Sequence, residues 1–514
     1  MYNLVSKINS IKNNKILLCI LGFFILYLSF YKNMLHGADK SFFSGFQLDS
    51  EALVLGNAFK DSEEIEHRFS NLGSITMKGT KDRIKQVYIF TNKKKESTSD
   101  VPVVKYENKT DKDTDNCIYV DLSFLGKMQQ AIGYQIIIGD EARFVKDVLI
   151  QDKLVKISYF GEPLPQKDNS KLSLNFDSFG KQYTDTSECT SQYGLQGQIT
   201  SFLFNKLNLS VKTIQKLNVI VFSFVILGLT WLFNRIFSKT LAGCFFVSVI
   251  FFPWIVSFAR NLYWIEFSWF LPAIFSWLLF IRNNKTERFG LYLCIYLSCW
   301  FKCLSGYEYF SSVLMFAIAP NVFQILMAEN KKYLYKNVQQ AFFICLTGTL
   351  GFIAALLMHA YLRSGGNISE GLSTIWSHDV LRRTYGGNVK DFAPVYAESF
   401  NASTFTVLKK YVLQWGTEVI SIPIIKWFSF RILLVLSIIA IIFSYRHNRK
   451  ESRYNLYLII TFCLPAISWY VLGKSYSFIH THMNYVLWYM GGIGAIFYVL
   501  YRDLTSRWNY VQKV

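Results

Sequence analysis

Carboxylate side chains follow the first apolar segment of this chain. Asp49 and Glu51 lie two positions apart in "FQLDSEALVLG", shortly after the apolar residues 15–32. A partly desolvated Asp or Glu can accept the proton of a hydroxyl group while that group attacks an electrophilic carbon. Asp39 lies nearer the apolar segment and offers the same chemistry. The sequence therefore gives three candidate catalytic carboxylates: Asp49, Glu51 and Asp39.

A second set of polar residues borders other apolar segments. Ionisable groups are costly at membrane depth and rarely face lipid, so their convergence from several loops indicates a functional site. Cations suit phosphate oxygens, and carboxylate and phenol groups suit substrate hydroxyls. The candidate phosphate-binding residues are Arg260, Lys302, Lys474, His480 and His482. The candidate substrate-binding residues are Glu266, Tyr307 and Glu308.

Simpler interpretations stay open for each group. Asp49 and Glu51 would also suit a solvated loop, and Arg260 with Glu266 would suit an ion pair at the membrane interface. Two histidines separated by one residue, with no third ligand nearby, are a weak metal signal. No cofactor motif occurs, because Walker, G-x-S-x-G, H-E-x-x-H and C-x-x-C patterns are absent. We therefore expect no cofactor, and a divalent metal is not indicated.

The composition predicts a membrane protein. Of 514 residues, 52% are hydrophobic, and several apolar runs are long enough to cross a bilayer. The net charge of +19 comes from Lys and Arg in short segments between these runs, which is typical of membrane topology rather than of nucleic-acid binding. Hydropathy predicts ten spans: 15–32, 216–235, 240–258, 266–281, 289–304, 309–328, 339–362, 429–445, 455–473 and 484–501.

Loop charge predicts the orientation of the chain. With a cytoplasmic N-terminus and an uncleaved first helix, every loop on the cytoplasmic side is basic. Strand-like runs such as "KQVYIFTN", "CIYVDLSFL", "YQIIIGD" and "LVKISYF" predict a β-rich outer domain, in which Cys117 and Cys189 are candidates for a disulfide. The predicted regions are 1–34 (N-terminus and first helix), 35–213 (outer domain), 214–362 (helices two to seven), 363–428 (outer loop with interfacial helices) and 429–514 (helices eight to ten and tail).

This order resembles a known enzyme superfamily. A short cytoplasmic start, one span, an outer segment that opens with "LDSE" at 48–51, and many further spans are similar to the GT-C membrane glycosyltransferases. Within that superfamily the chain looks like bacterial O-antigen-modifying enzymes of the Gtr type. The family often has D-x-D or E-x-D where this chain has D-S-E, and "YGLQG" at 193–197 also looks like part of that group. The expected fold is thus a polytopic α-helical, GT-C-like membrane protein with an extracytoplasmic β-rich domain.

The resemblance implies a reaction and its partners. The enzyme would transfer a hexose, with glucose expected, from undecaprenyl phosphate to lipid-linked O-antigen or another surface glycan. It would lie in the bacterial inner membrane, contact membrane lipid, and have its active site on the periplasmic side. Two alternatives stay open: a transporter or flippase of lipid-linked glycans, which would show repeat symmetry in matching halves, and an O-antigen polymerase, which would use a large outer loop late in the chain.

Overall fold

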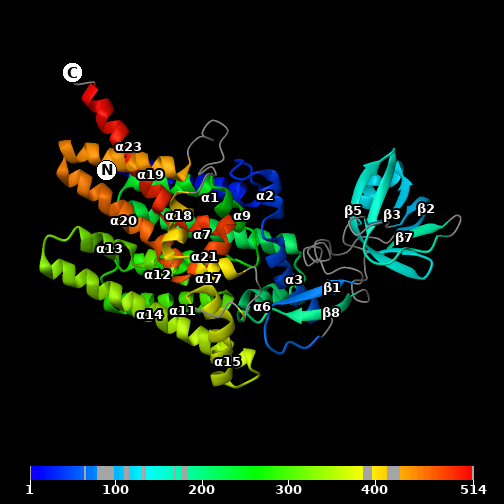
Figure 1. Cartoon of the computed structure of the whole chain (residues 1–514). Helices are drawn as coiled ribbons and strands as arrows, with labels where there is room; N and C mark the ends of the chain where they lie inside the picture. The colour runs from blue at the N-terminus through cyan, green and yellow to red at the C-terminus, as the bar shows by residue number, and fades with distance from the viewer. Residues whose placement is uncertain are drawn as a thin grey trace. The chain divides into compact units, whose positions relative to one another are not determined.

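The computed structural model is mainly helical and contains a smaller region of strands (Figure 1). It describes residues 2–62, 65–77, 98–108, 115–129, 131, 135–166, 170–175, 183–385, 390, 396–413 and 429–511.

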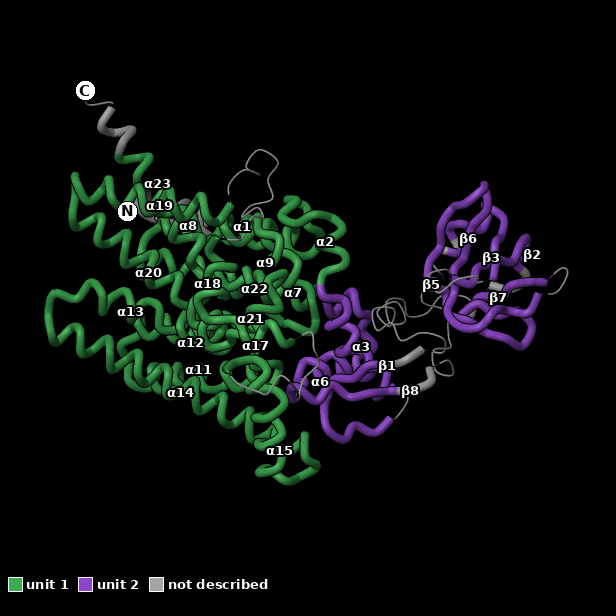
Figure 2. The backbone as a smooth tube through the Cα atoms, in the orientation of Figure 1, with its two compact units in different colours: residues 1–46, 216–514 green, residues 47–215 purple. Residues whose placement is uncertain are grey.

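The chain forms two compact units (Figure 2). Unit 1 contains residues 1–46 and 216–514, and unit 2 contains residues 47–215. The predicted outer domain began at residue 35, which is twelve residues too early. The reason is that Phe43 and Phe46, in and beside the helix α2 (Lys40–Gly45), belong to the hydrophobic core of unit 1.

Helices α7 to α23 and the first two helices build unit 1, and α7 begins just before the unit boundary. Their bounds are α1 (Tyr2–Lys32), α2 (Lys40–Gly45), α7 (Val211–Ile236), α8 (Lys239–Ile250), α9 (Pro253–Phe258), α10 (Phe267–Leu278), α11 (Lys285–Ser305), α12 (Phe310–Ala317), α13 (Ala319–Leu326), α14 (Lys331–Arg363), α15 (Ile368–Ile375), η5 (Trp376–Val380), α16 (Leu381–Arg383), α17 (Ala397–Asn401), α18 (Thr404–Val412), α19 (Phe430–His447), α20 (Arg449–Leu472), α21 (Lys474–Ile479), α22 (Thr481–Asn484), η8 (Tyr485–Tyr489) and α23 (Gly492–Val511).

Side-chain caps fix where the long helices begin. Asn284 accepts a hydrogen bond from the backbone of Thr286 at the start of α11, and Asn330 does the same for Lys332 at the start of α14. Asn448 caps α20 in the same way. Asn is favoured at this position because its side chain satisfies an amide that has no partner in the first turn. Asparagines in the loops therefore mark the residues at which these three helices begin.

Four described helices are long and apolar enough to cross a membrane: α7, α14, α19 and α20. A fifth span would be the pair Thr481–Tyr489 and Gly492–Ser506, which is bent by 54°. Shorter apolar helices are Ile16–Lys32, Lys239–Ile250 and Phe267–Leu278. Several predicted spans are therefore present, whereas the count of ten stays a prediction.

Two of the predicted spans are interrupted at prolines. The span 240–258 is divided into α8 and α9, and Pro253 starts α9. The span 309–328 is divided into α12 and α13, with Pro320 in the first turn of α13. Proline lacks an amide hydrogen and suits the first turn of a helix better than its middle, so each of these two breaks falls where a new helix can begin, although Pro272 and Pro465 lie inside α10 and α20.

Unit 2 combines a small α/β base with an inserted barrel. The base contains α3 (Leu48–Ser62), β1 (Gly73–Met77), β8 (Tyr183–Glu188), α6 (Leu195–Ser201) and η4 (Phe202–Lys206). The barrel contains β2 (Thr98–Glu107), β3 (Asn116–Asp121), η2 (Leu122–Phe124), α5 (Leu125–Gln129), β4 (Gln135–Ile138), β5 (Glu141–Gln151), β6 (Leu154–Tyr159) and β7 (Lys171–Asn175).

The six barrel strands close in the order β2-β3-β6-β5-β4-β7, and every neighbouring pair is antiparallel. Inward residues such as Ile118, Val145 and Ile157 form a hydrophobic core of their own. Because β2 pairs with β7, the first and last strands of the sheet have no free edge in the described part of the barrel. In sequence the barrel lies between β1 and β8, which pair antiparallel from Gly73 with Glu188 onward.

Within residues 35–213 the structure contains the predicted region of strands, and its extracytoplasmic location stays a prediction. The runs around β3, β4 and β6 are strands, whereas Asp49 and Glu51 lie on a helix, α3, rather than in a loop. The run "KQVYIFTN" lies outside the described residues. Cys117 and Cys189 are free thiols, so the candidate disulfide is wrong. Their sulfur atoms lie beside Ser158 and Ser191 respectively.

The segment "YGLQG" has a packing role in the base of unit 2. Tyr193 O accepts hydrogen bonds from the backbone and side-chain amides of Asn71, at 3.1 and 3.0 Å. Gly194 adopts φ of 86° and starts α6, a conformation that a side chain disfavours. A Cβ atom on Gly197 would lie 1.9 Å from Asn71 O. The glycines let α6 lie directly against the chain that leads into β1.

We expect Gly197→Ala to destabilise unit 2 by about 3 kcal/mol, because the backbone of Asn71 must move to admit the methyl group. Hydrogen exchange in the full-length protein should become faster at α6 and β1. The matched control is Gly126→Ala in α5, where an added Cβ meets no atom within 4 Å. Equal exchange rates in both variants would contradict this packing role.

Candidate functional site

A buried ionic network lies where the turn between α11 and α12 meets the segment from α15 to α16. Glu308 accepts a salt bridge from Arg383 at 3.2 Å, and both side chains are largely buried. Asp379 pairs with Arg363, and Arg382 lies 4.0 Å from the same carboxylate. Buried charges must be paired to offset their desolvation. The network therefore joins three segments that are far apart in the sequence.

Three residues predicted from the sequence belong to this network or border it. Lys302 Nζ donates a hydrogen bond to Gly306 O at 2.5 Å, and its charge acts on Glu308. Tyr307 lies next to Glu308 in the chain, and its hydroxyl group lies 3.2 Å from His359 Nδ1. Lys302, Tyr307 and Glu308 thus come together as expected. His480 is also close, since the charges of Glu308 and Arg383 both act on it.

Burial and neighbouring charge set the protonation of this site. Burial raises the pKa of Glu308, but the charges of Arg383 and Lys302 outweigh it, so this pKa lies below its ordinary value and the carboxylate is ionised. Burial and the neighbouring His482 lower the pKa of His480 to about 4. His480 is therefore neutral at pH 7, so it lacks the positive charge expected from the sequence.

Aromatic rings hold the site in place. The Tyr309 hydroxyl donates to Asn484 Oδ1 at 2.6 Å, and the backbone of Tyr309 adopts φ of 65°. Its ring packs edge-on against Trp469, which in turn contacts Tyr476. Tyr476 contacts His480, with ring centroids 4.3 Å apart. A non-glycine residue with positive φ persists only where its surroundings fix it, so this cluster of rings positions Glu308.

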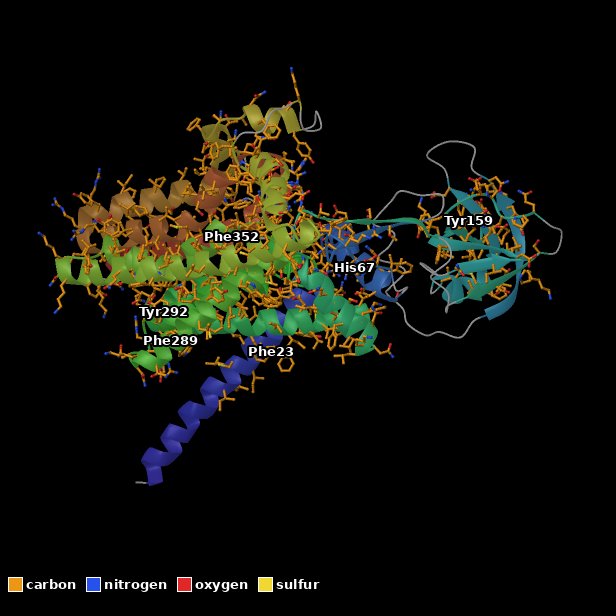
Figure 3. All side chains as sticks on the ribbon, turned by 90° about the horizontal axis from the view of Figure 1, so that it is seen from below. Phe23, His67, Tyr159, Phe289, Tyr292 and Phe352 are labelled. Atoms are coloured by element: carbon orange, nitrogen blue, oxygen red, sulfur yellow. The ribbon has the colours of Figure 1, made fainter. Side chains whose placement is uncertain are left out.

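An apolar cavity of about 660 Å³ adjoins the network. Asp379 and Arg383 form part of its wall, together with Tyr307. Phe352, labelled in Figure 3, lies on α14 and lines the same cavity. The other lining residues are Phe310, Ser311, Leu356, Leu372, Ser373, Ile375, Trp376, Val380, Thr384, Trp469 and Leu472. The cavity thus combines an apolar interior with a charged wall.

The remaining predicted cations have structural partners in unit 1. Arg260 donates to Phe43 O and Ser44 O and lies over the Phe43 ring, so it fixes α2. The alternative of an ion pair between Arg260 and Glu266 is not supported, because neither carboxylate oxygen of Glu266 has a hydrogen-bond partner within the described residues. Lys474 Nζ donates to Phe400 O and Ala402 O, both at 2.8 Å. These bonds hold the end of α17 against α21.

Glu266 is fully buried at the start of α10. Among the described residues, neither of its carboxylate oxygens has a hydrogen-bond partner. His482, the second predicted histidine, has its ring 5.7 Å from that of His480, and its backbone carbonyl accepts from Trp254 Nε1 at 2.5 Å.

The candidate bases occupy three different environments. Asp39 caps α2 in unit 1, and bonds from Ser41 and Phe42 lower the pKa of its exposed carboxyl group. Asp49 is exposed in the first turn of α3 in unit 2. Glu51 is buried, and Gln215 Nε2 lies 3.0 and 3.2 Å from its two oxygens. Of these three carboxylates, only that of Asp49 is exposed and does not cap a helix.

The sequence analysis did not select Arg363, Asp379, Arg382 or Arg383. The spacing of Asp379 with Arg382 and Arg383, three and four positions later, was a usable signal, because such pairs lie on one helix face. The pairing of Arg383 with Glu308 had no local signal in the sequence, because the two residues are 75 positions apart.

No family model, curated protein or solved structure matches this chain.

We expect Arg383→Met to destabilise the protein by about 3–5 kcal/mol, because it leaves the Glu308 charge buried without its partner. Adding Glu308→Gln should restore more than half of that loss. Thermal unfolding of the purified protein in detergent measures both effects. The control is Arg502→Met, which breaks an exposed pair with Glu451 and should cost about 1 kcal/mol or less. Equal losses for Arg383→Met and Arg502→Met would contradict the buried pairing.

Proposed function

We propose that this protein is a GT-C-type membrane glycosyltransferase that takes a hexose from a polyprenyl phosphate donor. The observation that carries the proposal is the apolar cavity whose wall contains Arg383 and Asp379. An isoprenoid chain needs an apolar channel, and its phosphate needs cations at the mouth of that channel. A water-soluble sugar nucleotide would also need cations for its diphosphate, but it would not need an apolar channel.

The charge of the network supports an anionic ligand. In its described part, the four cations Lys302, Arg363, Arg382 and Arg383 face the two carboxylates Glu308 and Asp379. Arg382 is 32% exposed, but the three largely buried cations still outnumber the two carboxylates by one, and excess buried positive charge is costly without a counter-ion. A phosphate bound beside Arg383 would supply that charge, and Arg suits it because the planar guanidinium can donate two parallel hydrogen bonds. The neutral His480 would add a hydrogen bond.

The chemistry needs a base and a stabilised leaving group. The acceptor hydroxyl oxygen attacks the anomeric carbon, the bond between that carbon and the phosphate oxygen breaks, and the electron pair leaves with the polyprenyl phosphate. The hydroxyl proton passes to a carboxylate, for which exposed Asp49 is our candidate and Asp39 the alternative. Glu51, which is held by Gln215, orients the start of α3. Cations at the phosphate stabilise the charge that grows as it leaves.

The proposed setting is the bacterial inner membrane, crossed ten times, with residues 35–213 and 363–428 on the periplasmic side. The acceptor is then a lipid-linked or other surface glycan. The basic loops around Lys285 and Lys331 would face the cytoplasm.

Cysteine labelling tests this orientation. We expect Asp140→Cys in unit 2 and Asn367→Cys before α15 to react with an impermeant thiol reagent added outside the cell. Thr286→Cys, at the start of α11, should react only after the membrane is opened. All three positions are exposed, and a background in which the native cysteines are serine removes unrelated labelling. Labelling of Asp140→Cys and Asn367→Cys from opposite sides would refute the topology.

The function is tested with purified protein and a panel of polyprenyl phosphate sugars. We expect transfer of one hexose, and we expect Leu372→Trp to raise the KM for the donor about tenfold, because the larger ring fills the cavity. The control is Leu357→Trp on α14, which is 41% exposed and does not line the cavity. Donor binding without transfer, under all acceptor conditions, would favour a transporter of lipid-linked glycans instead.

The same assay separates the candidate bases. Asp49→Asn should lower turnover about 100-fold or more while donor binding persists, because the amide keeps the shape but cannot accept the proton. Asp39→Asn should leave turnover near that of the native protein. The reverse result would move the role of base to Asp39, and full activity of both variants would refute a carboxylate base at either position.

A further inference from the structure

A second cavity of about 510 Å³ lies at the N-terminal ends of α11 and α14. Its lining residues are Asn283, Arg288, Tyr292, Lys336, Gln339, Gln340 and Phe343. The set contains two cations, three amides and two aromatic rings, and it contains no carboxylate. Figure 3 labels Tyr292, which lies beside Phe289 in the first half of α11. The chemistry of these side chains suits an anion that accepts hydrogen bonds.

One buried donor in this cavity lacks an acceptor. Gln340 is 8% exposed, and within the described chain its Nε2 atom has no hydrogen-bond partner. Its Oε1 atom lies 3.4 Å from Arg288 Nη2, which fixes the amide so that Nε2 is the free end. Arg288 Nη1 in turn donates to Leu279 O at 2.7 Å. A buried donor without a partner is unfavourable and rare, which points to a ligand that supplies an acceptor.

The position of the cavity relates it to a membrane surface. Helices α11 and α14 run in the same direction, because Arg288 contacts Gln340 near their starts and Tyr307 contacts His359 near their ends. Lys336 lines this cavity, and Leu356, twenty residues later in α14, lines the apolar one. Phe343 and Phe352, which also line the two cavities, are nine positions apart, so at about 1.5 Å per residue the linings on α14 are separated by about 14 to 30 Å and lie toward opposite ends of this helix.

Exposed aromatic side chains lie beside the cavity. Phe289 is 74% exposed, Phe342 60% and Phe343 42%. Large exposed aromatic side chains beside a span are expected where a helix faces lipid. A ligand that enters the cavity from this side must have an apolar part as well as an anionic one. Free phosphate meets only the second condition.

We propose that this cavity binds the phosphate group of an anionic phospholipid, in the leaflet opposite the cavity that contains Arg383. Lys336 and Arg288 provide charge, and the amides of Gln340 and Asn283 donate to phosphate oxygens. Tyr292 and Phe343 contact the glycerol and the start of an acyl chain. Basic pockets between membrane helices recognise lipid headgroups through the same combination of contacts. This proposal does not depend on glycosyl transfer.

Lipid titration of the full-length protein in detergent tests the site. After delipidation, native mass spectrometry should show saturable binding of phosphatidylglycerol and much weaker binding of phosphatidylcholine. Lys336→Gln should weaken phosphatidylglycerol binding about tenfold, because it removes a charge from the cavity wall. The matched control is Lys332→Gln, which removes the same charge from the same end of α14 outside the cavity and should change binding less than twofold.

Thermal unfolding with the same ligands adds a second measurement. Phosphatidylglycerol should raise the Tm of the native protein more than that of Lys336→Gln, and inorganic phosphate at the same concentration should leave both unchanged. Equal stabilisation by inorganic phosphate would overturn the lipid assignment. Equal weakening in Lys336→Gln and Lys332→Gln would show a general effect of charge, and unchanged binding in Lys336→Gln would also overturn the proposal.

Discussion

The helical unit depends on one constraint: the buried charges of Glu308 and Arg383 must be paired with each other. The two side chains lie 75 positions apart in the sequence and meet at 3.2 Å in the interior. Each would be costly alone, so the turn after α11 and the segment that contains α16 must be folded together. Asp379 extends the constraint to the end of α14 through Arg363. The salt bridges of Arg383 and Asp379 thus form the charged part of the wall of the apolar cavity.

Rigid surroundings make that pairing specific. The chain of rings from Trp264 through Tyr309 and Trp469 to Tyr476 lies behind the carboxylate. Two backbone positions, Ile265 and Tyr309, have positive φ, and a buried hydrogen bond lies beside each: Trp264 N donates to Asn261 Oδ1, and the Tyr309 hydroxyl donates to Asn484 Oδ1. Such positions store strain that the fold must offset, and they are common around functional sites. The packed rings and these hydrogen bonds thus fix the backbone at Tyr309, next to Glu308.

Close packing of α11 and α14 separates the two cavities. A Cβ on Gly351 would lie 2.5 Å from Tyr296 O, so only glycine allows these two helices to approach each other there. With their middles in contact, space for a ligand remains toward their ends, where Gln340 and Leu356 line different cavities. The apolar cavity has a charged wall that contains Arg383, and the other has amides and cations without carboxylates. A cavity with cationic residues in its wall thus lies toward each end of the helix pair.

Much of the local structure was determined by the sequence itself. Hydropathy placed helices at the predicted spans, although prolines divide two of them, runs of strand-forming residues placed β3, β4 and β6, and asparagines such as Asn330 lie at helix starts. These features depend on residues within a few positions of one another. The sequence also grouped Lys302, Tyr307 and Glu308, which are neighbours in the chain.

Tertiary structure decided the rest, because desolvation and packing act between distant residues. It paired Glu308 with Arg383, tied Arg260 to the α2 backbone instead of Glu266, kept Cys117 and Cys189 apart as thiols, and made His480 neutral by burying it.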